Sequence, residues 1–181
     1  MIKTNFKKSL FYSFIVIVII ILDRLSKLYV LNLAEIEQQV DIYIFSYLNL
    51  YLIWNTGVGF GLFSSDQSFY YNLVTIIIFF INILILIMIF KSNIYRKFLL
   101  LMILGGSLGN LFDRLYYSAV PDFIDIHYEN YHWFVFNVAD IFISFGIICL
   151  IFDEIFFNNS TNISPIIPTV IKISATLNTN Q

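Results

Sequence analysis

The chain has 181 residues, of which 59% are hydrophobic, 19% are aromatic and only 12% are charged. Soluble domains carry about 25% charged residues, so a water-soluble fold of this size could not bury so much apolar surface, and we expect lipid around it. The formal net charge of -2 and the lack of a basic cluster argue against a nucleic-acid partner. The single cysteine, Cys149, excludes an intramolecular disulfide framework or a cysteine metal site.

Four apolar segments predict four membrane-spanning helices, since one span needs roughly 20 mostly apolar residues. They are 9–31, 69–90, 98–115 and 134–157. Lysines precede the first segment, as in a signal peptide, but no small-x-small cleavage pattern follows it, so we interpret it as a retained helix. The second carries no charge, and the other three hold charges toward the same side of the membrane. The sequence therefore predicts an all-α integral membrane protein.

Lysine and arginine in the short flanking segments predict the orientation of these helices, because they concentrate on the cytoplasmic side. The connections 32–68 and 116–133 contain neither residue type. The basic residues that flank the spans are Lys3, Lys7 and Lys8 before the first, and Lys91, Arg96 and Lys97 between the second and third. We expect both termini in the cytoplasm and the two long connections outside.

The first outer connection predicts a small extracytoplasmic β-sheet platform within about 32–68. Val40, Ile42 and Ile44, and then the stretch 47–54, are rich in β-branched and aromatic residues. A glycine-rich segment follows, and alternating glycines permit tight turns or close approach of the backbone to a ligand. After residue 157 the composition becomes polar. We expect residues 1–157 to form a membrane domain and 158–181 a poorly ordered cytoplasmic tail.

Charged residues inside predicted spans cost a few kcal/mol each, so they are candidates for function by default. Asp23 and Lys27 lie one helical turn apart and can form an ion pair. Asp113 and Arg114 form a second couple of opposite charge, and we expect Asn110 to face that couple and bond to it. Both couples are also explained by a structural role, as neutral pairs that hold helix ends together.

Asp122 and Asp140 differ, because neither has a basic partner nearby in the sequence. Asp140 begins the fourth span after Asn137, a candidate N-cap, and the outer loop before it can fold back to bring Asp122 close. Each acid alone has a plain explanation: Asp140 as a favourable charge in a first helical turn and Asp122 as a solvated loop acid. Together, two close carboxylates would share one proton and could activate water against an amide.

Five ordered motifs resemble those of the lipoprotein signal peptidases, also called signal peptidase II, an aspartyl membrane peptidase family. They cover roughly residues 20 to 146. Gly59 stands where alanine is usual in the second motif. The motifs are D-R-L-S-K at 23–27, N-T-G-V-G-F-G at 55–61, G-G-S-L-G-N-L-F-D-R at 105–114, V-P-D-F-I-D at 120–125 and F-N-V-A-D at 136–140.

The resemblance implies a bacterial inner-membrane hydrolase, an aspartic endopeptidase with several spans and its active site on the extracytoplasmic side. It needs neither cofactor nor metal. Its substrate would be a prolipoprotein whose cysteine already carries diacylglycerol, cut on the amino side of that cysteine in contact with membrane lipid. We expect a monomer. By motif position, the catalytic pair is Asp122 and Asp140, Asp125 is a non-catalytic neighbour, and the lining or supporting residues are Asn55, Asn110, Arg114, Asn137, Asp23 and Lys27.

Two other functions are open at this point. A metalloprotease could use Asp125, His127 and Glu129, which alternate as on one strand face, with His132 nearby, although no H-E-x-x-H helix is present. A small transporter or ion-conducting protein could use intramembrane acids as proton relays, although the chain lacks the duplicated halves of many transporters. Cleavage of lipidated peptides by the purified protein would separate these classes.

Overall fold

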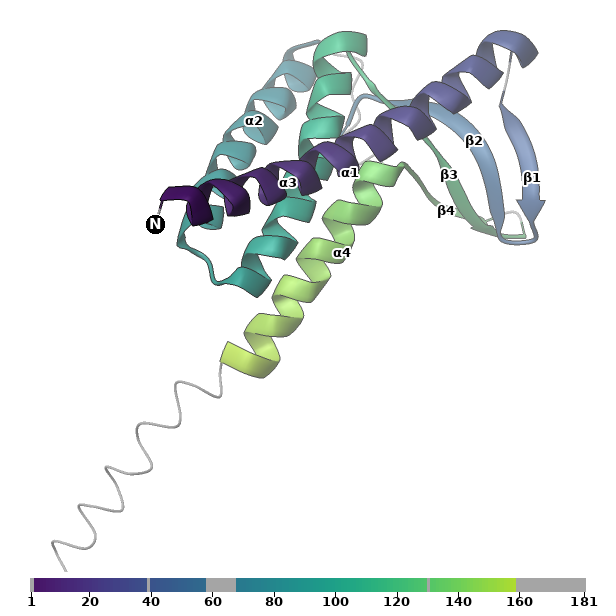
Figure 1. The fold of residues 1–181 in the computed structure, drawn as a ribbon. Coiled ribbons are helices and arrows are strands. Elements are labelled where there is room, and N and C mark those ends of the chain that lie inside the picture. Colours follow the sequence, from purple (N-terminus) through teal and green to yellow (C-terminus); the bar gives the residue numbers. More distant parts are fainter. Residues whose placement is uncertain (1, 39, 58–67, 130, 159–181) are drawn as a thin grey trace, which may run out of the picture. The chain divides into compact units, whose positions relative to one another are not determined.

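The computed structural model describes residues 2–38, 40–57, 68–129 and 131–158 (Figure 1). The chain divides into two compact units, Met1–Gly146 and Ile147–Gln181. In chain order the elements are α1 (Ile2–Glu37), β1 (Asp41–Phe45), β2 (Leu48–Asn55), α2 (Ser68–Lys91), α3 (Ile94–Tyr117), β3 (Val120–Tyr128), β4 (Tyr131–Phe136), α4 (Val138–Asp153) and the π-helical turn η2 (Glu154–Asn158). Gly59 and the tail residues 159–181 lie outside the described residues, so the predictions for them stay predictions.

Helix α3 packs against both α1 and α2 (Figure 1). The side chain of Asn93 caps its first turn by accepting a hydrogen bond from the backbone N–H of Arg96 at 2.9 Å. Ser118 ends it in the left-handed conformation at φ 59°, and its N–H donates to the Arg114 carbonyl at 3.2 Å. Both ends of the central helix are therefore fixed by local hydrogen bonds.

Three glycines let other elements approach α3 closely. A Cβ on Gly105 would lie 3.0 Å from the Ile19 side chain of α1, and one on Gly109 would lie 2.7 Å from Asp23 Oδ2. A Cβ on Gly106 would lie 2.5 Å from the carbonyl oxygen of Ala139 in the first turn of α4. Helix α3 thus carries small residues where the charged segment of α1 and the start of α4 pass it.

The four strands form one antiparallel sheet in the order β1-β2-β3-β4. The prediction confined this sheet to residues 32–68, which is wrong in extent, because β3 and β4 come from the second connection. The predicted start of the fourth span at residue 134 is also wrong. Phe134 and Phe136 pair with Ile126 and Ile124 of β3, so aromatic residues assigned to a helix extend the sheet instead.

The last turns of α1 pack on this sheet (Figure 1). A buried apolar cluster contains Val30 of α1, Val40, which lies just before β1, and Phe123 of β3. Partly buried neighbours include Leu33 of α1 and Leu50 of β2. This cluster connects α1 to β2 and β3, the two strands that contribute Asn55 and Asp122.

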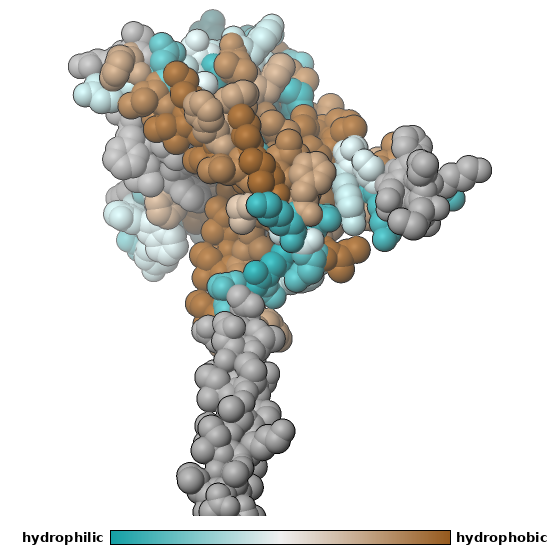
Figure 2. All heavy atoms as spheres, turned by 90° about the vertical axis from the view of Figure 1, so that its left-hand side faces the viewer, coloured by the Kyte–Doolittle hydropathy of each residue, from teal (hydrophilic) through white to brown (hydrophobic). Residues whose placement is uncertain are grey.

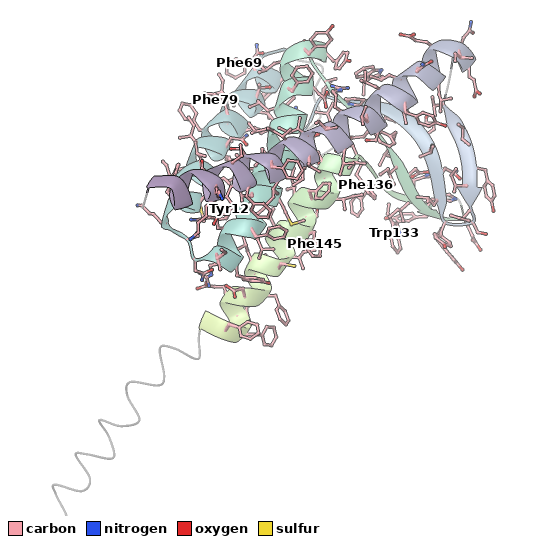
Figure 3. The ribbon with its side chains drawn as sticks, in the orientation of Figure 1. Tyr12, Phe69, Phe79, Trp133, Phe136 and Phe145 are labelled. Atoms are coloured by element: carbon pink, nitrogen blue, oxygen red, sulfur yellow. The ribbon has the colours of Figure 1, made fainter. Side chains whose placement is uncertain are left out.

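Two helices of the described part of the chain, Phe69–Lys91 and Ile94–Tyr117, are long and apolar enough to cross a membrane by length and composition. Apolar side chains cover most of the helical face in Figure 2, and Phe69 and Phe79 project outward from α2 (Figure 3) with exposed fractions of 70% and 51%. The regular part of α4 has 16 residues, fewer than the roughly 20 of a full span. Four spans therefore remain a prediction.

Candidate active site

Asp122 is fully buried in β3, where each of its carboxylate oxygens accepts a hydrogen bond from an amide. Asn55, the last residue of β2, donates from Nδ2 to Oδ2 at 2.8 Å. Asn137, between β4 and α4, donates from Nδ2 to Oδ1 at 2.6 Å. The carboxylate is thus held between the ends of two different strands.

Asp140 lies in the first turn of α4 and forms a reciprocal cap with Asn137. The Asn137 side chain accepts from the Asp140 N–H at 3.1 Å, and the Asp140 carboxylate accepts from the Asn137 N–H at 3.3 Å. The other carboxylate oxygen of Asp140 accepts from Asn110 Nδ2 at 2.8 Å. Asn137 therefore contacts both acids and brings two residues 18 positions apart in the sequence to one site.

The amide orientations of the three asparagines are determined by their other partners. Each side-chain oxygen faces a group that can only donate, so each amide NH2 must face a carboxylate. These donors are the Gly57 N–H for Asn55 at 2.8 Å, the Asp140 N–H for Asn137 at 3.1 Å, and the Lys27 ammonium for Asn110 at 2.8 Å. The site thus directs three amide donors toward its two acids.

Burial and a neighbouring charge raise the pKa of Asp122 from 3.8 to about 7. Burial is the larger cause, because it disfavours the charged carboxylate, and the negative charge of Asp140 is the second. The hydrogen bonds from Asn55 and Asn137 act in the opposite direction. Near neutral pH, Asp122 can therefore both hold and release a proton.

A buried ion cluster lies behind Asn110. All three Lys27 ammonium protons are used, in bonds to Asp23 Oδ2 at 2.8 Å, Asn110 Oδ1 at 2.8 Å and Asp113 Oδ2 at 2.6 Å. The second oxygen of Asp23 accepts from the backbone N–H of Ala139 at 3.0 Å. The predicted Asp23 and Lys27 pair is present, and it joins α1 to both α3 and the start of α4.

The predicted couple of Asp113 and Arg114 is wrong. Successive helix residues point about 100° apart, and Asp113 turns toward α1, where it binds Lys27 and Arg24. The guanidinium of Arg114 instead donates to the carbonyl of Gly57, just beyond β2. Asn110 contacts neither member of that couple, since its amide connects Lys27 to Asp140.

Tyr71 of α2 is a contact that the sequence motifs did not reveal. The Arg114 guanidinium lies 5.9 Å from its ring centroid, and its hydroxyl donates to the Arg114 carbonyl at 2.5 Å. A tyrosine in an apolar helix with many aromatic residues carries no pattern that marks it. Arg24 could have been found, because it is a charge within the first span that needs a partner.

The remaining polar group lies farther along β3. Asp125 and His127 are buried, and His132 of β4 is exposed. His132 Nδ1 lies 2.7 Å from Asp125 Oδ2, and His127 Nδ1 lies 3.5 Å from the same oxygen. Glu129 is not in this group of potential ligands and sits in the left-handed conformation at φ 51°. Strand side chains alternate, so Asp125, three positions from Asp122, points to the other face.

The fold is shared with bacterial membrane enzymes of known structure. One, solved by the in meso method at 2.3 Å resolution, aligns with a TM-score of 0.63 and 23% identity over 83% of this chain and 90% of that one. Another, solved at 1.9 Å, gives a TM-score of 0.60 and 24% identity over 81% and 93%. The likeness covers most of both chains, so it shows a common fold.

A family model described as signal peptidase (SPase) II matches residues 15–156. The lipoprotein signal peptidase of Pelagibacter ubique (strain HTCC1062) is 53% identical over 157 residues, which cover 87% of this chain and 95% of the relative. That of Anaplasma phagocytophilum (strain HZ) is 38% identical over 149 residues, covering 82% and 94%. The chain belongs to the signal peptidase II family, as the sequence motifs predicted.

Proposed function

We propose that this protein is an aspartic endopeptidase that removes signal peptides from bacterial prolipoproteins, with Asp122 and Asp140 as its catalytic pair. One observation carries the assignment of these residues: Asn137 bonds both buried carboxylates, at 2.6 Å and 3.3 Å. Two acids held this close favour a state with one shared proton. Such a pair can supply a general base and a general acid at the same time.

The chemistry follows from that single proton. The ionised carboxylate takes a proton from water as the water oxygen attacks the peptide carbonyl. The protonated carboxylate gives its proton to the carbonyl oxygen, and a gem-diol forms. When this collapses, the protonated carboxyl gives its proton to the leaving nitrogen, the other carboxylate takes a proton from a diol hydroxyl as the C–N bond breaks, and the pair again holds one proton. Both acids begin and end the cycle in the same combined protonation state.

The asparagines and Lys27 are positioning residues in this scheme. Asn55 and Asn137 fix the plane of the Asp122 carboxylate, and Asn110 fixes that of Asp140. Lys27 orients Asn110 by donating to its oxygen at 2.8 Å. Arg114 holds the backbone just beyond β2 through the Gly57 carbonyl and so supports the position of Asn55. Groups held this way need little reorganisation during the reaction.

The exposed apolar side chains of the helices suit contact with lipid, so we place the protein in the bacterial inner membrane as a monomer. In this arrangement residues 1–157 form a domain with four spans, both termini and the tail 158–181 are cytoplasmic, and the site is extracytoplasmic. The substrate carries diacylglycerol on its cysteine and is cut on the amino side of that residue. Its acyl chains can stay in the bilayer while the peptide enters between helices and sheet.

The test is turnover of a lipidated prolipoprotein peptide by the purified protein in detergent. Asp122→Asn and Asp140→Asn should each lower the rate by several orders of magnitude, because an amide can neither accept the proton from water nor return it. Asp125→Asn should keep measurable turnover, since its carboxylate bonds His132 on the other face of the sheet. A single cooperative thermal unfolding transition in each of the three variants would show that the fold is intact.

Substantial activity in folded Asp122→Asn or Asp140→Asn protein would remove the assigned mechanism. Absence of cleavage by folded wild-type protein, with both lipidated and unlipidated peptides, would favour the transport alternative.

A further inference from the structure

The face of the sheet opposite Asp122 carries a second polar group that the proposed function does not use. Asp125, His127 and His132 each offer one potential ligand atom for a metal, and these atoms all lie within 4.8 Å of one another. The two histidine rings lie nearly parallel, with centroids 5.3 Å apart and an interplanar angle of 28°. Strand pairing sets this arrangement, because His127 of β3 is the direct partner of His132 in β4.

Within the described residues, several buried polar atoms on this face have no hydrogen-bond partner. These atoms include Asp125 Oδ1, His127 Nδ1 and, on the neighbouring strand β2, Asn49 Oδ1. Asn49 is the direct partner of Asp125 in the sheet, so the three belong to one patch. A buried polar atom without a partner costs roughly 1–3 kcal/mol. Three such atoms in one place therefore point to a ligand that satisfies them.

The carboxylate of Asp125 and the imidazole of His127 can bind a cation. Carboxylate oxygen and imidazole nitrogen are ligands of Zn²⁺, and they bind at about 2.0–2.2 Å, so donors around a tetrahedral ion lie roughly 3.3 Å apart. The distances from Asp125 Oδ2 to the two histidine Nδ1 atoms, 2.7 Å and 3.5 Å, bracket this spacing. A rotation of the His132 side chain, which is 55% exposed, would open the shorter distance.

We propose that Asp125, His127 and His132 bind one Zn²⁺ ion, with water as the fourth ligand on the exposed His132 side. The ion would connect β3 to β4, the strand pair that leads into Asn137 and α4. It would not take part in peptide cleavage, because Asp122 faces the other side of the sheet.

The experiment uses the full-length protein, purified in detergent, stripped with a chelator and then dialysed against Zn²⁺. Metal analysis should find one tightly bound Zn²⁺ per chain, and Zn²⁺ should raise the thermal unfolding temperature, since a ligand that binds only the native state stabilises it. His132→Gln and Asp125→Asn should each weaken binding by at least about tenfold. Asp41→Asn, which alters an exposed acid of β1, should bind as the wild type does.

His132 is exposed, so its substitution should not prevent folding, and the test does not depend on the two buried ligands. Failure of wild-type protein to retain stoichiometric Zn²⁺, or equal retention by His132→Gln, would overturn the proposal. Peptide cleavage, measured in parallel, separates the two sites. The proposed function fails if Asp122→Asn is active, whereas the zinc site fails if folded wild-type protein binds no metal.

Discussion

At Asp122, opposing effects are balanced within one carboxyl group. Burial and the charge of Asp140 raise its pKa to about 7, while two amide donors favour its ionised form. If either amide were lost, the remaining effects would raise the pKa further. The asparagines therefore set the pH range of the site as well as its geometry.

This balance predicts the pH dependence of cleavage. The state with one shared proton is lost as pH rises through the pKa of Asp122, so kcat/KM should fall above about pH 7. Asn55→Ala removes the donor to Asp122 Oδ2 and should move this decline to higher pH. The measurement is the rate of cleavage of a lipidated peptide from pH 5 to 9. An identical alkaline limb in both proteins would contradict the role of Asn55.

The same pKa shift predicts how stability changes with pH. The pKa of Asp122 is higher in the folded protein than its ordinary value of 3.8, so the folded state binds more protons than the unfolded state between pH 4 and 7. Stability from this group is complete below pH 4 and is lost as pH rises through 7. Thermal unfolding in detergent should therefore show a weaker loss of stability with rising pH in Asp122→Asn than in the wild type. If stability fell equally with pH in both proteins, the raised pKa of Asp122 would be contradicted.

At the scale of elements, α3 connects the charged segment of α1 to the start of α4. Alanine normally stabilises a helix by about 1 kcal/mol relative to glycine, so a loss of stability on Gly→Ala substitution reports packing. A Cβ on Gly106 meets the Ala139 backbone oxygen at 2.5 Å, whereas one on Gly105 meets the side chain of Ile19 at 3.0 Å. The contact at Gly105 needs Ile19 to shift by only a few tenths of an ångström, whereas the contact at Gly106 needs the Ala139 backbone to move farther.

We therefore expect Gly106→Ala to lower the thermal unfolding temperature and to slow cleavage, because it displaces the turn that holds Asp140. Gly105→Ala is the matched control and should have a smaller effect on both, because its clash with Ile19 is milder. Detergent unfolding curves and peptide cleavage rates measure these outcomes. Equal behaviour of the two variants would show that the approach of α4 to α3 is not critical.

Lys27 is the second connection between elements. Methionine in its place would leave Asp23 without its charged partner and remove one of the two cations on Asp113. Removing one partner of a buried ion pair costs about 3–5 kcal/mol, because the other charge is left unpaired. Lys27→Met should therefore unfold at a much lower temperature than the wild type. Lys91→Met, at the exposed end of α2, is the control and should unfold as the wild type does. Similar stability of both variants would contradict a structural role for Lys27.

The sequence predicted those features that depend on local spacing. Helix α2 extends one residue beyond each end of the predicted 69–90, because nothing interrupts its apolar run. The pair of Asp23 and Lys27 follows from a separation of four residues on one helix. The partner of Asp113 could not be predicted this way, since Lys27 lies 86 residues away and meets it only through helix packing.

The strands show the same difference between what local sequence predicts and what only long-range pairing determines. The aromatic residues of β4 suit either a strand or the start of an apolar helix, and only pairing with β3 decides between them. The five motifs identified the family and contain the asparagines that bond the two acids in the described residues, but not Tyr71, which contacts Arg114. They did not indicate which asparagine contacts which acid, because that follows from the meeting of β2, β3 and the first turn of α4.

At the scale of the whole molecule, the proposed orientation makes the turn between α2 and α3 cytoplasmic and the sheet extracytoplasmic. The turn contains Ser92 and is flanked by three basic residues, whereas the loops that form the sheet have none. Ser92→Cys and Glu129→Cys place one thiol in each region, in a background in which Cys149→Ser removes the native thiol. Both positions are exposed or partly exposed, so a water-soluble maleimide can reach them.

In intact bacterial cells, an impermeant maleimide should label the cysteine at 129 and spare that at 92, and permeabilisation should make both react. This outcome follows because α2 ends at Lys91, and moving that charge through the bilayer is costly. Labelling of both positions from outside would require an even number of spans between sheet and turn, and would contradict the four-span arrangement. Labelling only at 92 would invert the orientation and put the Asp122 site in the cytoplasm, away from exported prolipoproteins.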